Sequence, residues 1–392
     1  MYASMWSYPW DLLDCGMEKS LDEMRQNGLT GVSMITSYHA GRFLCIRSPK
    51  RKIYFPEDGV LYYPSDLKRF RGLKIQPRTG AFIREHPDFW DRLFSAAEQR
   101  NMMVSGWTVC LHNTRIGKAY PEVCVRNAYG DIVYYNQCPS SPDARQYMAA
   151  LMDDLLSVLP LYAVELESMN FMGHAHEFHH EKDGIGLTAL QDFLFSLCFC
   201  PSCVERAWTE GVDILPAQRR VRGWLDEICA GTMNGSDQEF LSSGLEYFRG
   251  TPEVYEYLQW RSTVVTSLMK EVHQVTSGRS QLFFLSLLAN TRSWLFGVDL
   301  SKISAECEGI VMCSYDCDER QAERDIRGFD GRLAPDTKLM VGMRCFTPEY
   351  ADEAAFARKV TACRNEEVDG FNFYNYGLIP ESRLKWIRNS LE

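Results

Sequence analysis

The segment YAVELESMNFMGHAHEFHHEK, Tyr162–Lys182, begins as an apolar strand and turns into a loop rich in carboxylates and histidines. Glu165 and Glu167 alternate with apolar residues, and residues two apart share one face of an extended strand. Both carboxylates are therefore expected to point the same way. Four of the chain's eight histidines follow within residues 174–180. So many titratable side chains at the end of a buried strand indicate a functional site.

Short apolar runs recur on both sides of this segment, and most are followed by a stretch in which apolar residues have helical spacing. Including the opening segment, the runs cover 1–8, 31–38, 102–110, 162–167, 281–288, 309–315, 338–345 and 370–377. Right-handed crossovers between such strands make a parallel sheet, and eight strands close it into a barrel. The sequence predicts one (β/α)8 TIM barrel domain over residues 1–392.

The chain exceeds a typical barrel of about 250 residues by roughly 140 residues. Long insertions after strands two, three and four are expected to absorb this excess, with a helical insertion at about 188–277. Ser141 can cap a helix that begins at Pro142. An open doubly wound sheet would often carry a glycine-rich phosphate turn after its first strand, and the sequence has none there.

Composition excludes several classes of partner. The net charge is −10 and there is no long basic run, so no nucleic-acid partner is expected. No stretch approaches the roughly 20 apolar residues that span a bilayer, so no membrane partner is expected. The N-terminus lacks the pattern of a signal peptide, and the fourteen cysteines are scattered, which predicts reduced thiols and a cytoplasmic location. A homo-oligomer is left open.

Catalytic groups of such barrels lie at the carboxyl ends of the strands. Seven of the eight predicted strands end in polar or aromatic residues, which would converge at one rim. The candidates are Trp6, His39, Arg42, Trp107, His112, Asn113, Glu165, Glu167, Asp316, Arg344, Asn372, Tyr374 and Tyr376.

Two carboxyl groups on opposite sides of an anomeric carbon can break a glycosidic bond: one protonates the leaving oxygen, and the other attacks the carbon or activates water. We assign Glu167 as nucleophile or base, Asp316 as acid and Glu165 as a supporting carboxylate. A helix N-cap role is the alternative for Asp316. The predicted substrate is a small glycoside or oligosaccharide. Its predicted binding residues are the aromatic Trp6, Trp107, Tyr374 and Tyr376 and the polar His39, Arg42, His112, Asn113, His176, His180, Glu181, Arg344 and Asn372.

The histidine loop also matches H-E-x-x-H formally, from His176 to His180. That motif needs a helix and a third ligand, whereas this one follows a strand, so no metal or other cofactor is expected. The alternative is a divalent metal ion held by His176 and His180 together with Glu165 and Glu167, in a lyase or isomerase of sugar acids. A third alternative is a sugar-binding barrel without catalysis. Cys198, Cys200 and Cys203 form CFCPSC, and one CxxC pair alone favours core packing over zinc.

Five motifs give the chain a family resemblance. They are the opening Trp6, SYHAGR (Ser37–Arg42), LHNTR (Leu111–Arg115), ELES (Glu165–Ser168) and the closing GFNFYNYG. With these motifs, the chain resembles the glycosyl hydrolase-like TIM-barrel proteins of the broad alpha-amylase-like glycosidase superfamily. The resemblance covers nearly the whole chain and implies a barrel glycosidase.

Two departures from related barrels bear on the site. Retaining barrels of the largest glycosidase clan carry Asn-Glu after strand four and Glu at the end of strand seven, where this chain has Leu166-Glu167 and Arg344. Amylase-like barrels place the nucleophile on strand four and the acid on strand five. Strand five offers no carboxylate here, so Asp316 on strand six is the nearest substitute.

Overall fold

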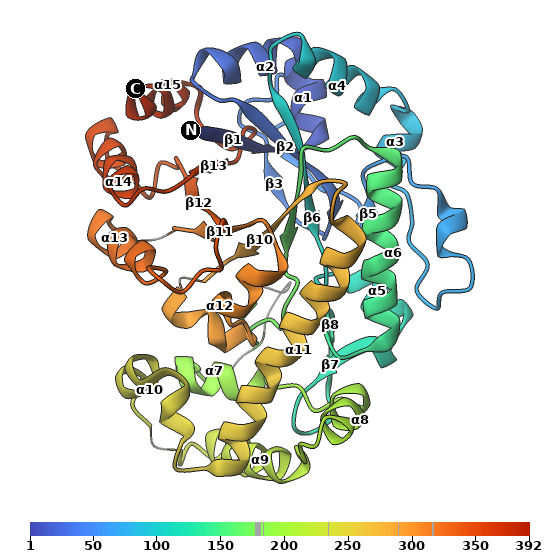
Figure 1. The fold of residues 1–392 in the computed structure, drawn as a ribbon, viewed down its shortest axis with the longest axis vertical. Helices are drawn as coiled ribbons and strands as arrows, with labels where there is room; N and C mark the ends of the chain where they lie inside the picture. The colour runs from blue at the N-terminus through green and yellow to red at the C-terminus, as the bar shows by residue number, and fades with distance from the viewer. Residues whose placement is uncertain (177–181, 183, 234, 289, 316) are drawn as a thin grey trace.

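A computed structural model describes residues 1–176, 182, 184–233, 235–288, 290–315 and 317–392. Eight parallel strands form a closed barrel, in the order β1, β2, β6, β9, β10, β11, β12, β13 and back to β1 (Figure 1). Their bounds are β1 Tyr2–Ser7, β2 Gly31–Tyr38, β6 Met103–Val109, β9 Ala163–Glu167, β10 Gln281–Ser286, β11 Gly309–Cys313, β12 Lys338–Arg344 and β13 Gly370–Tyr374. The predicted (β/α)8 fold is confirmed.

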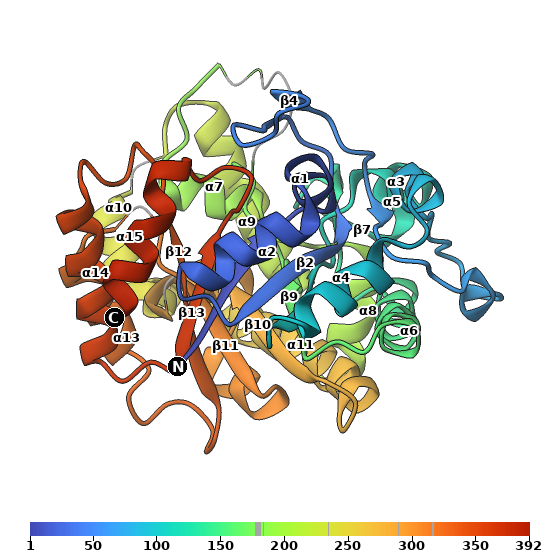
Figure 2. The ribbon, with the colours of Figure 1, turned by 90° about the horizontal axis from the view of Figure 1, so that it is seen from above.

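Helices surround the barrel, and α13, α14 and α15 lie side by side along one flank (Figure 2). The helices of this outer layer are α1 Pro9–Cys15, α2 Met17–Gln26, α4 Phe89–Glu98, α6 Pro142–Val158, α11 Pro252–Thr276, α12 Leu300–Ile303, α13 Glu319–Arg327, α14 Glu353–Asn365 and α15 Glu381–Leu391, with short 3-10 turns η4 Asn290–Phe296 and η5 Ser304–Glu306.

Strand alternation divides the interior into two cores. In β9, Val164 and Leu166 face outward into the large core between barrel and helices. Ala163 faces inward and joins a second, aromatic-rich core with Trp6 and Trp107. Each buried aliphatic side chain stabilises the fold by about 1.5–3 kcal/mol. The period-two pattern therefore places both glutamates of β9 on the barrel side.

Additional elements lie between three barrel strands and the outer helices that follow them: between β2 and α4, between β6 and α6, and between β9 and α11. Figure 1 shows α7, α8, α9 and α10 gathered at the end of the molecule away from α15, with α11 running back to the barrel. The elements are β3 Phe43–Leu44, β4 Ile53–Tyr54, β5 Val60–Leu61, η1 Leu67–Phe70 and α3 Ala81–Glu85; α5 Thr114–Ala119, η2 Pro121–Val123, β7 Cys124–Arg126 and β8 Ile132–Gln137; and α7 Ala189–Phe195, α8 Pro201–Thr209, α9 Leu215–Cys229, α10 Asp237–Ser243 and η3 Gly244–Phe248. Within the described residues, no helix is long and apolar enough to cross a membrane.

One predicted helix is divided in two. The pattern over 188–211 predicts helix, but α7 ends at Phe195 and α8 begins only at Pro201. Proline cannot donate a backbone hydrogen bond and fits the first turn of a helix, so the chain before it leaves the helical conformation. Cys200 is extended and forms the N-cap of α8. Cys198 and Cys200 thus lie between the two helices.

We expect Ser141→Ala to destabilise the protein by about 1 kcal/mol. Ser141 is the N-cap of α6, as predicted, and its side chain accepts a hydrogen bond from the backbone of Ala144. Alanine would leave that donor without its partner. Urea denaturation measures the loss. Ser95→Ala, on an exposed position of α4, is the control and should be nearly neutral; equal stability of both variants would contradict the capping role.

Candidate functional site

Glu165 is enclosed within the barrel, with 2% of its surface exposed. Trp6 Nε1 donates to its Oε2 at 2.6 Å and Ser33 Oγ donates to the same oxygen at 2.7 Å. Asn372 Nδ2 donates to Oε1 at 2.7 Å. Burial raises the pKa of Glu165, and these three hydrogen bonds oppose the rise. Both oxygens are occupied inside the barrel, which suits a carboxylate that organises its neighbours.

Glu167 ends β9 and is partly exposed, unlike the four residues before it. Trp107 Nε1 donates to its Oε2 at 2.6 Å. Burial raises the pKa of Glu167 from 4.5 to about 7, against the opposing effect of the Trp107 hydrogen bond. Among the described residues Trp107 is the one hydrogen-bond partner of its carboxyl group. Glu167 is therefore accessible from the barrel mouth, and its Oε1 has no hydrogen bond within the described residues. Its pKa allows it to give or take a proton near neutrality.

Tyrosines surround Glu167 at the mouth of the barrel. Tyr8 shares hydrogen bonds with the hydroxyls of Tyr38 at 2.9 Å and Tyr374 at 2.8 Å. Burial raises the pKa of Tyr38, Tyr374 and Tyr315, and the charge of Glu167 adds to each rise. Trp107 lies edge-on to Tyr374, with ring centroids 5.8 Å apart. This arrangement offers neutral hydroxyl groups and flat apolar faces next to the carboxyl group.

Three histidines form a second group beside β9. The rings of His39 and His112 stack at 4.2 Å, and His176 meets His112 edge-on at 4.4 Å. Burial lowers the pKa of His112 far below its usual range, and electrostatic repulsion from His39 and His176 lowers it further. Burial also lowers the pKa of His39. Neutral imidazoles present one donor and one acceptor each, which suits hydroxyl groups.

The chain turns sharply after Glu167. Ser168 has φ +56°, a conformation that non-glycine residues seldom adopt and that is concentrated at functional sites. A cavity of about 350 Å³ opens beyond it, a size typical of small-ligand pockets. Its wall includes Ser168, Asn170, Met172, His176, Asp192, Phe193, Leu287, Leu295 and Phe296. Ser168 connects this cavity to the strand of Glu167, and His176 connects it to the histidines.

The structure corrects the predicted roles of Trp6, Asn372 and Asn113. Trp6, predicted to offer its aromatic face, and Asn372 are each 1% exposed and donate to Glu165, so neither is accessible to a substrate. Asn113 is also buried: its Oδ1 caps α5 through Ile116, and its Nδ2 donates to the carbonyl of Gly59. These polar groups build the walls of the barrel mouth. A strand-end position by itself does not reveal whether a side chain points to ligand or protein.

Three further predictions also have different outcomes. Arg344 forms an ion pair with Glu349 and lies over the ring of Tyr315 at 4.4 Å, at the mouth. Tyr376 donates to Glu23 of α2 at 2.8 Å and is buried outside the group around Glu167, so it does not join the other predicted binding residues at the mouth. Arg42 is exposed on the loop after β2. His180, Glu181 and Asp316 lie outside the described residues, so their roles stay predictions.

Sequence reasoning missed Ser33, Tyr8, Tyr38 and Tyr315. Ser33 lies in the middle of β2, where a small polar residue gives no periodic signal. Tyr8 and Tyr38 directly follow or end their strands, and an inspection of every strand end for hydroxyl groups could have found them.

Trp107→Phe should raise the pKa of Glu167 above that of the wild type. The indole N–H is the donor that opposes the effect of burial, and phenylalanine keeps an apolar ring without it. Carboxyl ¹³C NMR of a glutamate-labelled sample over a pH range measures the shift, and Glu167→Gln assigns the resonance. An unchanged pKa would show that the hydrogen bond does not control the protonation of Glu167.

Comparisons place the fold among solved glycosidases. No family model and no curated protein sequence match the chain. The glycoside hydrolase domain of PgaB (BpsB) from Bordetella bronchiseptica has a TM-score of 0.57 at 11% identity, over 99% of this chain and 96% of that one. The β-galactosidase from Halorubrum lacusprofundi gives 0.54 at 12% identity, over 100% and 58%.

The alpha-L-fucosidase isoenzyme 2 from Paenibacillus thiaminolyticus gives a TM-score of 0.53 at 9% identity, over 95% of this chain and 45% of that one. The chain thus spans about half the length of the galactosidase and the fucosidase and nearly the whole PgaB domain. The predicted likeness to glycosidase barrels is confirmed at the level of fold: this chain has the eight-stranded parallel barrel that these glycoside hydrolases have.

Proposed function

We propose that this protein is a glycoside hydrolase that acts on a small glycoside or oligosaccharide. The observation that carries the proposal is the state of Glu167. Its carboxyl group is partly exposed at the mouth of the barrel, and burial raises its pKa to about 7. Structural neighbours that are themselves glycoside hydrolases support the proposal through the shared fold.

In this proposal Glu167 acts as the general acid. A carboxyl group with a pKa near 7 is largely protonated at slightly acidic pH and can protonate the leaving glycosidic oxygen. The indole of Trp107 binds Oε2, so Oε1 is the oxygen that carries the proton. A nucleophile would need a lower pKa. The raised value therefore favours the acid role over the nucleophile or base role that the sequence suggested.

The second carboxylate is proposed to be Asp316, which then takes the role of base or nucleophile. Its support comes from the sequence, where it follows the end of β11. Tyr315, the residue before it, interacts electrostatically with Glu167 at the mouth. Two carboxyl groups at this edge would meet the minimal requirement for glycoside cleavage.

Substrate binding is proposed to use the aromatic and neutral polar groups around Glu167. The partly exposed ring of Tyr374 can pack against the apolar side of a sugar ring, while Trp107, with 3% of its surface exposed, holds Glu167 from within the barrel. His39 and His112, whose pKa values burial lowers, and the neighbouring His176 can exchange hydrogen bonds with hydroxyl groups. The cavity beyond Ser168 gives room for one small sugar unit.

Incubation of the purified protein with a panel of aryl glycosides and short oligosaccharides tests the proposal. We expect turnover of at least one substrate, with strong loss in Asp316→Asn and retained binding. Thermal stabilisation by a sugar without turnover would favour the non-catalytic barrel instead. Turnover of sugar acids that requires an added divalent ion would favour the lyase or isomerase. The cytoplasmic location stays a prediction from the sequence, and the question of a homo-oligomer stays open.

A further inference from the structure

Four buried cysteines from two separate insertions meet outside the barrel. Their Sγ atoms all lie within 4.8 Å of one another, and the four residues are Cys138, Cys198, Cys200 and Cys203. Cys138 follows β8 and approaches Cys203 across 65 residues of sequence, with 3.4 Å between the sulfurs. Cys198 Sγ lies 3.8 Å from Cys138 Sγ. The isolated CFCPSC motif therefore acquires a fourth thiol that only the fold supplies.

These separations match the coordination sphere of one small metal ion. Zinc–thiolate bonds of about 2.3 Å in a tetrahedron set the sulfurs about 3.8 Å apart. Thiolates in sets of four select zinc or iron, and sulfurs this close leave no room for a multi-iron cluster among them. All four residues are buried, which suits a closed structural site.

The backbone around the sulfurs is already arranged for this geometry. The N–H of Ser140 lies 3.4 Å from the sulfur of Cys138, to which it donates. Cys203 Sγ lies 3.3 Å from Ser140 Oγ. Cys200 is the N-cap of α8, so the positive end of a nine-residue helix faces the group. The Ser140 N–H and the end of this helix both favour negative charge on the sulfurs.

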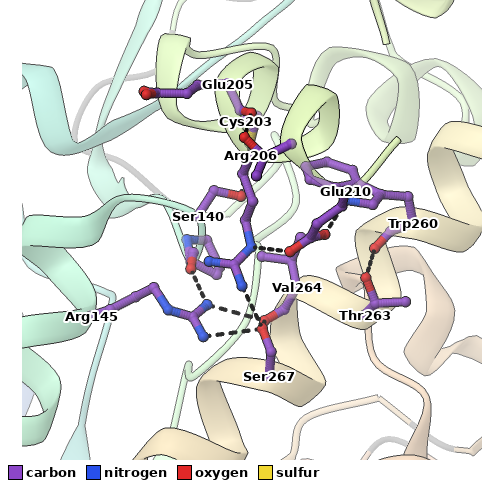
Figure 3. A network of polar contacts seen from close by, with 12 residues as sticks. Ser140, Arg145, Cys203, Glu205, Arg206, Glu210, Trp260, Thr263, Val264 and Ser267 are labelled. Atoms are coloured by element: carbon purple, nitrogen blue, oxygen red, sulfur yellow. Dashed lines mark hydrogen bonds and ion pairs between the residues drawn. The ribbon is translucent and has the colours of Figure 1, made fainter. Parts of the chain in front are cut away.

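Arginines hold the two cysteine-bearing segments against α11 (Figure 3). Arg145 donates to the carbonyl of Pro139 at 2.9 Å and to Ser267 Oγ at 3.0 Å. Arg206 donates to the same Ser267 Oγ at 3.2 Å. The loop after Cys138 and the helix that carries Cys203 are thereby fixed to one residue of α11. The ligands would lose little conformational freedom on binding a metal.

A buried cation lies near the sulfurs as well. Arg261 has no exposed surface, and within the described part of the chain its Nε and Nη2 atoms have no hydrogen-bond partner. It lies within electrostatic range of Cys198, Cys203 and Cys138. A zinc ion with four thiolates carries two negative charges, so a neighbouring guanidinium would stabilise it.

We propose that Cys138, Cys198, Cys200 and Cys203 bind one structural Zn²⁺ ion. On binding, each thiol releases its proton to solvent and forms one zinc–sulfur bond, with no change of oxidation state. The ion joins the insertion after β6 to the insertion after β9. The first of these insertions carries Tyr135, whose hydroxyl donates to the carbonyls of Gly173 and His174 beside the cavity. The zinc site thus supports one wall of the mouth, and it is independent of the proposed hydrolase activity.

Metal analysis of the full chain, purified under reducing conditions and incubated with ZnCl₂, tests the site. We expect one tightly bound zinc per chain and, after exchange with Co²⁺, the intense visible absorption of a tetrahedral thiolate complex. Cys200→Ser and Cys203→Ser should abolish stoichiometric binding. Cys307→Ser should retain it, because Cys307 is also buried but donates to the carbonyls of Ile303 and Gly309 elsewhere. Removal of zinc by a chelator should lower the Tm of the wild type and of Cys307→Ser alike.

A folded, reduced wild-type chain that binds neither Zn²⁺ nor Co²⁺ would overturn the proposal, and this measurement needs no variant to fold. Full zinc binding by the serine variants would overturn the ligand assignment. Tightly bound iron in place of zinc, or two disulfides that persist under reducing conditions, would also contradict it.

Discussion

Glu167→Gln is expected to lower turnover of an accepted glycoside by roughly 10²–10⁴-fold while the barrel stays folded. Glutamine keeps the shape of the side chain and the hydrogen bond from Trp107 but cannot deliver a proton. Steady-state kinetics on the best substrate of the panel measures the effect. Substrates with highly acidic phenol leaving groups should lose less activity, because they depart without full protonation.

The pH dependence of the same pair of proteins provides a second readout. In the wild type, activity should fall as pH rises past about 7, where Glu167 loses its proton. Glutamine has no such ionisation, so that limb should vanish from its residual activity. Glu98→Gln, on the exposed surface of α4, is the control and should keep the wild-type profile. Wild-type-like turnover in Glu167→Gln would refute the acid role.

The raised pKa of Glu167 should also make the stability of the wild type depend on pH. The native state binds more protons than the unfolded chain between pH 4.5 and about 7, because the pKa of Glu167 is raised in the fold. The stability of the wild type therefore falls as pH rises through this window, by about 1.4 kcal/mol per pKa unit. Glutamine avoids this loss. The difference in free energy of unfolding between Glu167→Gln and the wild type should favour the variant more above pH 7 than below pH 4.5. Urea denaturation of both proteins at the two pH values measures this difference.

Glu165→Ala is expected to destabilise the protein by roughly 3–9 kcal/mol, since each of three buried donors left unsatisfied costs about 1–3 kcal/mol. Trp6, Ser33 and Asn372 would all lose their acceptor inside the barrel. This loss is large compared with the roughly 5–15 kcal/mol by which most domains are stable. Chemical denaturation at a fixed pH gives the difference, and reduced yield of folded protein would accompany it.

Glu165→Gln is the matched control. Its carbonyl oxygen can accept from Trp6 and Ser33, while its amide faces Asn372. Asn372 Oδ1 has no hydrogen-bond partner among the described residues, so a flip of the Asn372 amide turns an acceptor toward the new donor. We expect a loss of about 1 kcal/mol or less. Equal destabilisation by alanine and glutamine would mean that the charge of Glu165, and not its hydrogen bonds, stabilises the protein.

The candidate site was only partly readable from the sequence. The period-two alternation correctly placed Glu165 and Glu167 on one face of β9. It did not separate their roles, because a distance of two residues along the strand decides burial: Glu165 meets three donors, and Glu167 meets Trp107 and the mouth. Asn113 and Tyr376 likewise stand near strand ends but bond to protein.

The sequence by itself determined the barrel, because apolar alternation, helix caps such as Ser141 and the order of strands and helices are local or periodic properties of the chain. Only the tertiary structure decided which side chains meet. The ring of strands brings Asn372 to Glu165 across 207 residues, and two insertions bring Cys138 to Cys203. Such contacts depend on distances between segments that no local pattern encodes. For that reason the raised pKa of Glu167 and the four-cysteine group emerge only from the folded chain.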